Sequence, residues 1–185
     1  MHLNLSASKV RAQPHVRLRP INENDVHSIL SWVNNPDIVG NLASFSGEPF
    51  TEEQELAYIE AMRESESDWV YSIIDEAEGR YLGQIGIHQI HERSMVGRLS
   101  VVIGSKENMS QGYGSAAIRA LLNVAFKGEG SLHKVWLMVF ETNLRAQRTY
   151  KRLGFKVEGC LRDEYFHNGE WHNMIRMSLL ASEWK

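Results

Sequence analysis

The chain has 185 residues, a formal net charge of -3 and one cysteine, Cys160. This length is enough for one domain with its own hydrophobic core, without disulfides or a structural metal. A single cysteine excludes an internal disulfide framework and a cysteine-based zinc site, and it favours a cytoplasmic location. No apolar run is long enough to span a membrane, and no lysine- or arginine-rich run marks a nucleic-acid surface. We therefore expect neither a membrane nor a nucleic acid as a partner.

The N-terminal part of the chain predicts a leader, a strand and a helix. Residues 1–14 show no hydrophobic periodicity and are expected to form a flexible leader, followed by a single domain over residues 15–185. Residues 15–20 alternate between polar and apolar side chains, as a strand with one buried face does. A helix capped by Asn22 is expected to follow and to end at residue 33.

The next segment predicts a loop, a second helix and a strand meander. Residues 37–50 contain Gly, Ser and Pro with scattered apolar groups, and a loop of this length in a compact domain is often functional, so we expect it to face the substrate. The sequence T-E-E-Q from Thr51 offers a capping box for a helix. From Trp69 the period becomes that of strands, and three successive antiparallel strands are expected up to Gly104.

The C-terminal half predicts two further helices and three strands. A helix is expected from about Ser115. The segment 134–140 is apolar almost throughout and is expected to be a central strand covered on both faces. A helix over 143–153 and a hairpin with its turn at Asn168-Gly169 follow. The order of elements predicts the α/β class, with one mixed sheet layered by helices.

The segment from Ser110 to Ser115 has the pattern of an anion site. Two glycines stand two residues apart directly before a helix, where the first backbone amides lack intrahelical acceptors and the helix dipole is positive. A pyrophosphate would fit these amides. By itself the pattern is equally typical of a glycine-rich tight turn, and it matches neither the Walker A loop nor the dinucleotide-binding fingerprint.

A second motif links this segment to a family. The spacing of Asn143, Ala146, Tyr150, Gly154 and Phe155 resembles the N-x-x-A/S-x-x-x-Y-x-x-x-G-F signature of the GNAT acetyltransferases, at the place where that family carries it. The tail EGCLRDEYFHNGEWHNMIRMSLLASEW and the start VRLRPINENDVHSI are similar to the Rim-type protein N-terminal acetyltransferases and the spermidine N-acetyltransferases. The resemblance covers about residues 15–184.

The resemblance implies a fold and a cofactor. The fold would be the GNAT fold, a single mixed and mostly antiparallel sheet whose two central strands splay apart, with helices on both faces. The cofactor would be acetyl-CoA, with its pantetheine arm paired to the backbone of Val101, Val102 and Ile103. Its pyrophosphate would lie on the loop and helix start formed by Met109, Ser110, Gln111, Gly112, Tyr113, Gly114 and Ser115. The family has Gln or Arg where this chain has Met109, so we expect backbone amides to form most of this site.

The resemblance also implies roles for two side chains. Tyr150 would protonate the departing thiolate, since a phenol with a pKa near 10 keeps its proton at neutral pH. Asn143 would contact the pantetheine arm. From spacing alone, Tyr150 could equally pack in the core at helical spacing from Ala146 and Leu153, and Asn143 could equally cap a helix.

The general base is not assigned by the sequence. Many relatives carry a Glu on the strand before the loop, but Arg98 stands at the matching position. His88, Glu92, Glu164 or an ordered water chain could accept the proton instead, and each of these side chains could equally be a solvated surface group. His88 and His91 are not expected to bind a metal, because residues three apart on a strand point to opposite faces.

The acceptor is expected to be a small-molecule or peptide amine. Between residues 48 and 68 eight acidic residues stand against one arginine, and an acidic wall attracts a cationic amine such as a polyamine or a basic protein N-terminus. These acidic residues could instead form the solvent-exposed face of an amphipathic helix. An amino sugar or aminoglycoside is an alternative acceptor, and a non-catalytic acetyl-CoA sensor is an alternative function. The resemblance also allows a homodimer, since relatives often pair through edge strands or the C-terminal hairpin.

Overall fold

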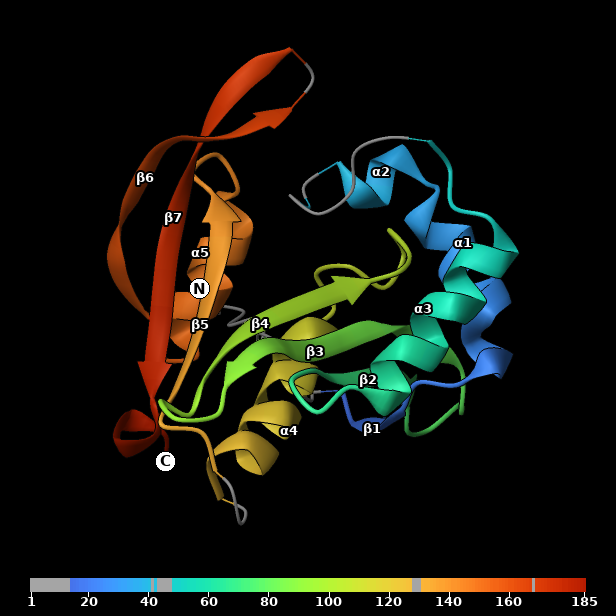
Figure 1. Ribbon diagram of the computed structural model, residues 1–185, viewed down its shortest axis with the longest axis horizontal. Coiled ribbons are helices and arrows are strands. Elements are labelled where there is room, and N and C mark those ends of the chain that lie inside the picture. Colours follow the sequence, from blue (N-terminus) through green and yellow to red (C-terminus); the bar gives the residue numbers. More distant parts are fainter. Residues whose placement is uncertain (1–13, 41, 43–47, 128–130, 168) are drawn as a thin grey trace, which may run out of the picture.

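The computed structural model describes residues 14–40, 42, 48–127, 131–167 and 169–185. Their core is a seven-stranded sheet with the order β1-β2-β3-β4-β5-β7-β6. Every neighbouring pair is antiparallel except β4 and β5, which run parallel. The strands are β1 (Val16–Pro20), β2 (Trp69–Asp75), β3 (Tyr81–His91), β4 (Val96–Ile103), β5 (Lys134–Phe140), β6 (Lys156–His167) and β7 (Glu170–Leu180) (Figure 1). The predicted α/β class, the meander and the C-terminal hairpin are confirmed. Apart from Pro14, the predicted leader lies outside the described residues.

Helices cover both faces of the sheet. Helix α4 (Tyr113–Lys127) buries Ile118 and Leu121 in the main core, together with residues of β3, β4 and β5. Helices α1 (Val26–Val33), α2 (Pro36–Val39) and α3 (Glu52–Glu64) form a second core on the other face, where Val70 of β2 packs against them. The remaining helical segments are α5 (Leu144–Arg152) and the 3-10 turns η1 (Glu23–Asp25) and η2 (Ala181–Glu183). None of the helices within the described ranges is long and apolar enough to cross a membrane.

The caps expected from the sequence form, and one short helix was missed. Thr51 and Gln54 make the predicted capping box at the start of α3. Asn22 caps η1, so the first helix opens with a 3-10 turn before α1. The prediction of a continuous loop over 37–50 is wrong at its start: Asn35 accepts a hydrogen bond from the Asp37 amide at 3.1 Å, and the fixed φ of proline at the next position favours a helical turn. Residues 41 and 43–47 of that loop lie outside the described residues.

The two faces of strand β5 are buried to different degrees. Val135, Leu137 and Val139 are buried in the main core, but Trp136 and Met138 on the opposite face are half-buried. The guanidinium of Arg176 lies 4.1 Å from the Trp136 ring centroid on that face. The prediction of a strand covered on both faces therefore holds only in part: Phe140, on the face of Trp136 and Met138, is 5% exposed, but the rest of that face is half-buried under side chains such as Arg176.

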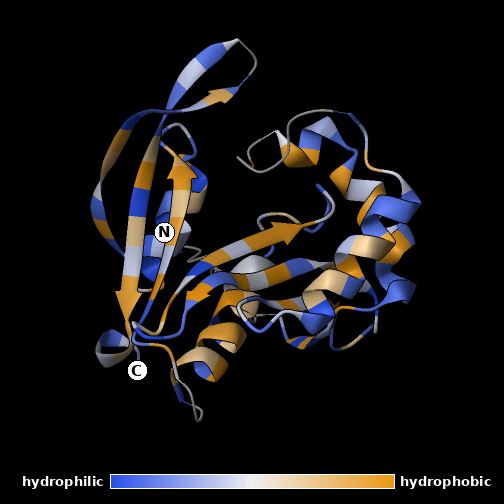
Figure 2. Ribbon diagram, in the orientation of Figure 1, coloured by the Kyte–Doolittle hydropathy of each residue, from blue (hydrophilic) through white to orange (hydrophobic). Residues whose placement is uncertain are grey.

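The two central strands splay apart, as expected. β4 and β5 pair only at Val96 with Lys134, Gly97 with Val135 and Arg98 with Trp136. Beyond Arg98 the described part of β4 has no partner on its β5 side, and the two strands separate (Figure 1). Their diverging C-terminal ends are both apolar, orange in Figure 2. The backbone edge of residues 99–103 therefore has no strand partner on its β5 side.

Candidate active site

A cavity of about 520 Å³ lies beyond the ends of the two separating strands, between the loop that follows β4 and the segment that follows β5. Two segments far apart in sequence, the loop between β4 and α4 and the start of α5, supply most of its walls. The lining residues are Asp37, Lys106, Met109, Ser110, Thr142, Asn143, Leu144 and Arg145. Three of the predicted cofactor residues, Met109, Ser110 and Asn143, thus lie around one cavity.

The loop before α4 presents backbone amides. Gly112 has a φ of +97°, in the left-handed region that favours glycine. The first helical hydrogen bond runs from the Ala116 amide to the Gly112 carbonyl at 3.0 Å. The amides of Tyr113, Gly114 and Ser115 therefore lie in the first turn, where an α-helix offers no internal acceptor, and are available to an anion.

The side chain of Tyr113 makes a hydrogen bond within the fold. Its hydroxyl donates a hydrogen bond to Asp75 Oδ2 at 2.7 Å, which ties the start of α4 to the end of β2. Val101 and Ile103 pack against the main core and Val102 packs against the second core. These four predicted cofactor residues could therefore contact a ligand through their main-chain groups.

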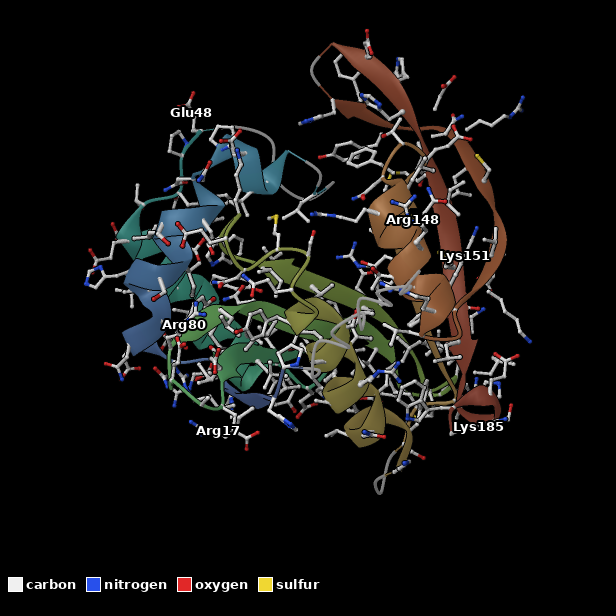
Figure 3. All side chains as sticks on the ribbon, turned by 180° about the vertical axis from the view of Figure 1, so that it is seen from behind. Arg17, Glu48, Arg80, Arg148, Lys151 and Lys185 are labelled. Atoms are coloured by element: carbon white, nitrogen blue, oxygen red, sulfur yellow. The ribbon has the colours of Figure 1, made fainter. Side chains whose placement is uncertain are left out.

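Arg145 is a site residue that sequence reasoning missed. Its Nη1 donates a hydrogen bond to Ser110 Oγ at 3.3 Å, and its Nη2 lies 3.8 Å from the sulfur of Met109. Arg145 therefore brings a guanidinium to the loop at Met109. The signal for it was the run of bases on α5, which contains Arg145, Arg148, Lys151 and Arg152 and no acid. Figure 3 shows Arg148 and Lys151 projecting from this helix.

Asn143 caps a helix and Tyr150 packs against the core, as their sequence spacing allowed. Asn143 Oδ1 accepts a hydrogen bond from the Ala146 amide at 3.1 Å and so caps α5. Tyr150 packs against the main core, with its ring 5.9 Å from that of Phe155. Burial raises the pKa of Tyr150 to about 12, and its hydroxyl has no hydrogen-bond partner among the described residues. A phenol of this kind stays protonated at neutral pH and is free to donate to a ligand.

The three side-chain candidates for the general base, and Arg98, have different surroundings. Glu92 and Glu164 are exposed. Arg98 is the last residue of β4 that pairs with β5, and its Nε is buried without a hydrogen-bond partner among the described residues. His88 is largely buried and bonded at both ring nitrogens, to Asp68 at 3.0 Å and Ser100 at 2.8 Å. Within the described ranges no group of three or more His, Cys, Asp or Glu residues could hold a metal ion.

The acidic segment is mainly a solvated helix face. Glu52, Glu53, Glu60 and Glu64 are exposed on α3, which supports the amphipathic reading. Glu55 is the exception on this helix: it is 5% exposed, and burial raises the pKa of its carboxyl. Asp68 is the other exception, because it binds His88.

Comparison with known proteins agrees with this geometry. Residues 15–156 match the acetyltransferase (GNAT) domain. The chain is 28% identical over 169 residues to a spermidine N(1)-acetyltransferase of Escherichia coli strain K12, covering 91% of this chain and 88% of the relative. It is 26% identical over 167 residues to a spermidine N(1)-acetyltransferase of Vibrio cholerae, covering 90% of this chain and 94% of that one.

A solved structure shares the fold over nearly the whole chain. The crystal structure of spermidine N-acetyltransferase from Vibrio cholerae in complex with CoA and spermine superposes with a TM-score of 0.83 at 23% identity, covering 91% of this chain and 97% of that chain. The splayed strands, the glycine loop before α4 and the family match lead to one assignment. The protein belongs to the GNAT family of acetyltransferases and is an acetyl-CoA-dependent N-acyltransferase.

Proposed function

We propose that the protein transfers the acetyl group of acetyl-CoA to a primary amine of a polyamine of the spermidine type. Two relatives that each align with about nine-tenths of this chain are spermidine acetyltransferases. The alignments cover 88% and 94% of the length of those two enzymes, so the similarity includes their acceptor-binding part. The homodimer and the cytoplasmic location stay predictions.

The observation that carries the proposal is the unpaired edge of β4. The pantetheine arm carries amide groups. On the β5 side of β4, the backbone of Val101, Val102 and Ile103 offers hydrogen-bond donors and acceptors that do not pair with β5. At the cavity beyond the strand ends, the amides of the α4 start and the guanidinium of Arg145 would bind the pyrophosphate. The thioester would then lie toward the point where β4 and β5 separate, near Arg98 and Leu99.

The chemistry is a direct displacement. The neutral amine attacks the thioester carbonyl, the tetrahedral oxyanion accepts a hydrogen bond from a free amide of β4, and collapse expels the thiolate of CoA. Tyr150 donates its proton to this thiolate, which agrees with its unpartnered hydroxyl and raised pKa. No acetyl-enzyme forms in this scheme.

Thiol release from acetyl-CoA by the purified protein tests the acceptor. The panel holds spermidine, spermine, a short peptide with a free N-terminus, an amino sugar and an aminoglycoside, with acetyl-CoA binding measured alongside. Turnover with the polyamines and not with the others is the expected result. Turnover confined to the peptide or the sugars would refute the polyamine acceptor, and tight binding without release by any amine would indicate a sensor instead of an enzyme.

A further inference from the structure

Three polar side chains are hydrogen-bonded in a row: Asp68, directly before β2, His88 of β3 and Ser100 of β4. Asp68 Oδ1 lies 3.0 Å from His88 Nδ1, and His88 Nε2 lies 2.8 Å from Ser100 Oγ. The side chains of His88 and Asp68 are only 15% and 19% exposed. A carboxylate at one ring nitrogen and a hydroxyl at the other is the arrangement by which enzymes turn an imidazole into an oriented base.

The local backbone holds these three hydrogen-bonded side chains in place. A Cβ on Gly86 would stand 2.9 Å from His88 Nε2, so glycine leaves the space in which the imidazole lies over the strand and reaches Ser100. Directly after His88 the pairing of β3 and β4 is interrupted and Gln89 has a φ of +54°. This bulge directs the Gln89 amide to Asp68 Oδ1, at 3.3 Å.

Asp68 is held from its other side as well. The hydroxyls of Ser65 and Ser67 donate to its Oδ2 at 2.8 and 2.9 Å. Burial alone would raise the pKa of Asp68, but these hydrogen bonds and those from Gln89 and His88 outweigh it and the pKa is lowered. The carboxyl is therefore ionised at neutral pH and accepts from His88, which leaves the lone pair of Nε2 facing Ser100.

The hydrogen-bonded triad of Asp68, His88 and Ser100 ends where β4 and β5 separate. Ser100 lies two residues beyond Arg98, the last residue of β4 that pairs with β5, and it is half-buried. Its side chain shares a face of β4 with Arg98 and Val102, the face on which α1, α2 and α3 pack. An arm of acetyl-CoA that enters at the α4 loop and follows the free edge of β4 would bring its thioester to this point.

The electrostatic surroundings keep His88 neutral. Burial lowers the pKa of His88, the charge of Arg98 lowers it further, and Asp68 opposes both; the net pKa lies below its usual value. Among the described residues, Asp68 on the β2 side and Arg98 on β4 are the charged groups that act on this imidazole. A neutral imidazole can accept a proton at physiological pH.

We propose that His88, acting through Ser100 and oriented by Asp68, removes the proton from the acceptor amine, in place of the carboxylate that Arg98 replaces. This inference rests on the proposed acetyl transfer. As the amine nitrogen bonds to the thioester carbon, its N–H bond breaks and the proton passes to Ser100 Oγ. The former hydroxyl proton of Ser100 passes to His88 Nε2, and the imidazolium is stabilised by Asp68. Ser100 and His88 are then catalytic residues and Asp68 is a positioning residue.

The test begins with His88→Gln, Ser100→Ala and Ser100→Thr. Loss of a general base lowers rates by about 100- to 10,000-fold. We expect His88→Gln to lower kcat/KM by a factor in this range. Ser100→Ala should be impaired in the same direction, whereas Ser100→Thr keeps the hydroxyl and should retain most activity. His27→Gln is the matched control, since His27 is exposed on α1. Acetyl-CoA affinity and melting temperature should stay unchanged in the Ser100 variants.

The pH profile separates a catalytic role from a structural one. In the wild type, kcat/KM should carry an acid limb from protonation of His88, in addition to the ionisation of the amine. His88→Gln should lose this limb. Asp68→Asn removes the group that raises the pKa of His88, so the limb should move to lower pH while the maximal rate falls because the ring loses its orientation.

The outcomes distinguish this inference from the proposed function. A wild type that acetylates an amine, with a folded His88→Gln variant equally active and an unchanged acid limb, would overturn the relay and leave the function standing. An acetyl group found on Ser100 by intact-mass measurement after incubation with acetyl-CoA would also overturn it, because Ser100 would then be a nucleophile. A wild type that releases no thiol with any amine would overturn both.

Discussion

Arg145 on α5 and Ser110 in the loop before α4 are hydrogen-bonded at 3.3 Å, so the two walls of the cofactor cavity meet at an arginine. We expect Arg145→Gln to weaken acetyl-CoA binding about tenfold, because a charge-assisted hydrogen bond to phosphate is worth roughly 1.5–3 kcal/mol and this site is partly solvated. Isothermal titration with acetyl-CoA measures the change.

Arg152→Gln is the control for charge. It removes the same charge from the same helix, but Arg152 lies at the far end of α5 and does not line the cavity. An equal loss of affinity in both variants would mean that the net charge of α5, and not the contact at Ser110, attracts the cofactor. Raising the salt concentration should weaken the difference between wild type and Arg145→Gln.

Gly112→Ala should impair both stability and cofactor binding. Its φ of +97° disfavours a side chain, and the new Cβ would stand 3.1 Å from Pro14 Cδ. We expect a loss of about 1 kcal/mol or more in the free energy of unfolding, with weaker acetyl-CoA binding because the loop amides shift.

Gly79→Ala gives the matched comparison for this strain. Gly79 has a φ of +70°, no atom of the described residues beyond its own neighbours lies within 4 Å of the added Cβ, and it lies in the turn between β2 and β3. It should lose stability to a similar degree while acetyl-CoA affinity stays at the wild-type value. An unchanged affinity in Gly112→Ala as well would argue against the loop as the pyrophosphate site.

Tyr150→Phe should lower kcat by about 10- to 1,000-fold, the range expected when a general acid is lost. The hydroxyl has no partner among the described residues and the ring packs against the core, so removing the oxygen should leave folding intact. Steady-state kinetics with acetyl-CoA titration checks both expectations. Tyr71→Phe, a half-buried tyrosine of β2, serves as control, and an unimpaired Tyr150→Phe enzyme would remove Tyr150 from the mechanism.

Asp25→Asn should destabilise the protein at neutral pH. Asp25 is 3% exposed; it pairs with Arg19 at 2.6 Å and accepts from Ser72 at 2.6 Å. Burial alone would raise the pKa of Asp25, but these two partners outweigh it and lower the pKa. Because Arg19 is partly exposed, we expect a loss of about 2 kcal/mol, below the range for a fully buried pair.

The pH dependence of this effect has a defined sign. A carboxyl with a depressed folded-state pKa contributes stability above its unfolded value of roughly 3.9, and that contribution disappears as the pH falls through the folded value. Urea unfolding at pH 7 and below pH 4 should therefore show a difference between wild type and Asp25→Asn that shrinks in acid. Glu23→Gln, at an exposed pair with Arg63, should change stability little at either pH.

Local hydrogen bonding made much of the fold predictable. The capping box of Thr51 and Gln54 and the cap at Asn143 involve residues three apart, so their sequence spacing alone specifies the geometry. The glycine loop before α4 was predictable for the same reason. The short helix α2 escaped because four residues are too few to show a helical period.

What the sequence by itself determined was the order of elements, the caps, the family motifs and the glycine loop before α4, all of which depend on near neighbours. The tertiary structure decided which side chains meet. Arg145 reaches Ser110 across 35 positions, and His88 reaches Asp68 across 20 and Ser100 across 12. These contacts depend on strand register, on the bulge after His88 and on the space above Gly86. Such features arise from packing between distant segments, which no local pattern encodes.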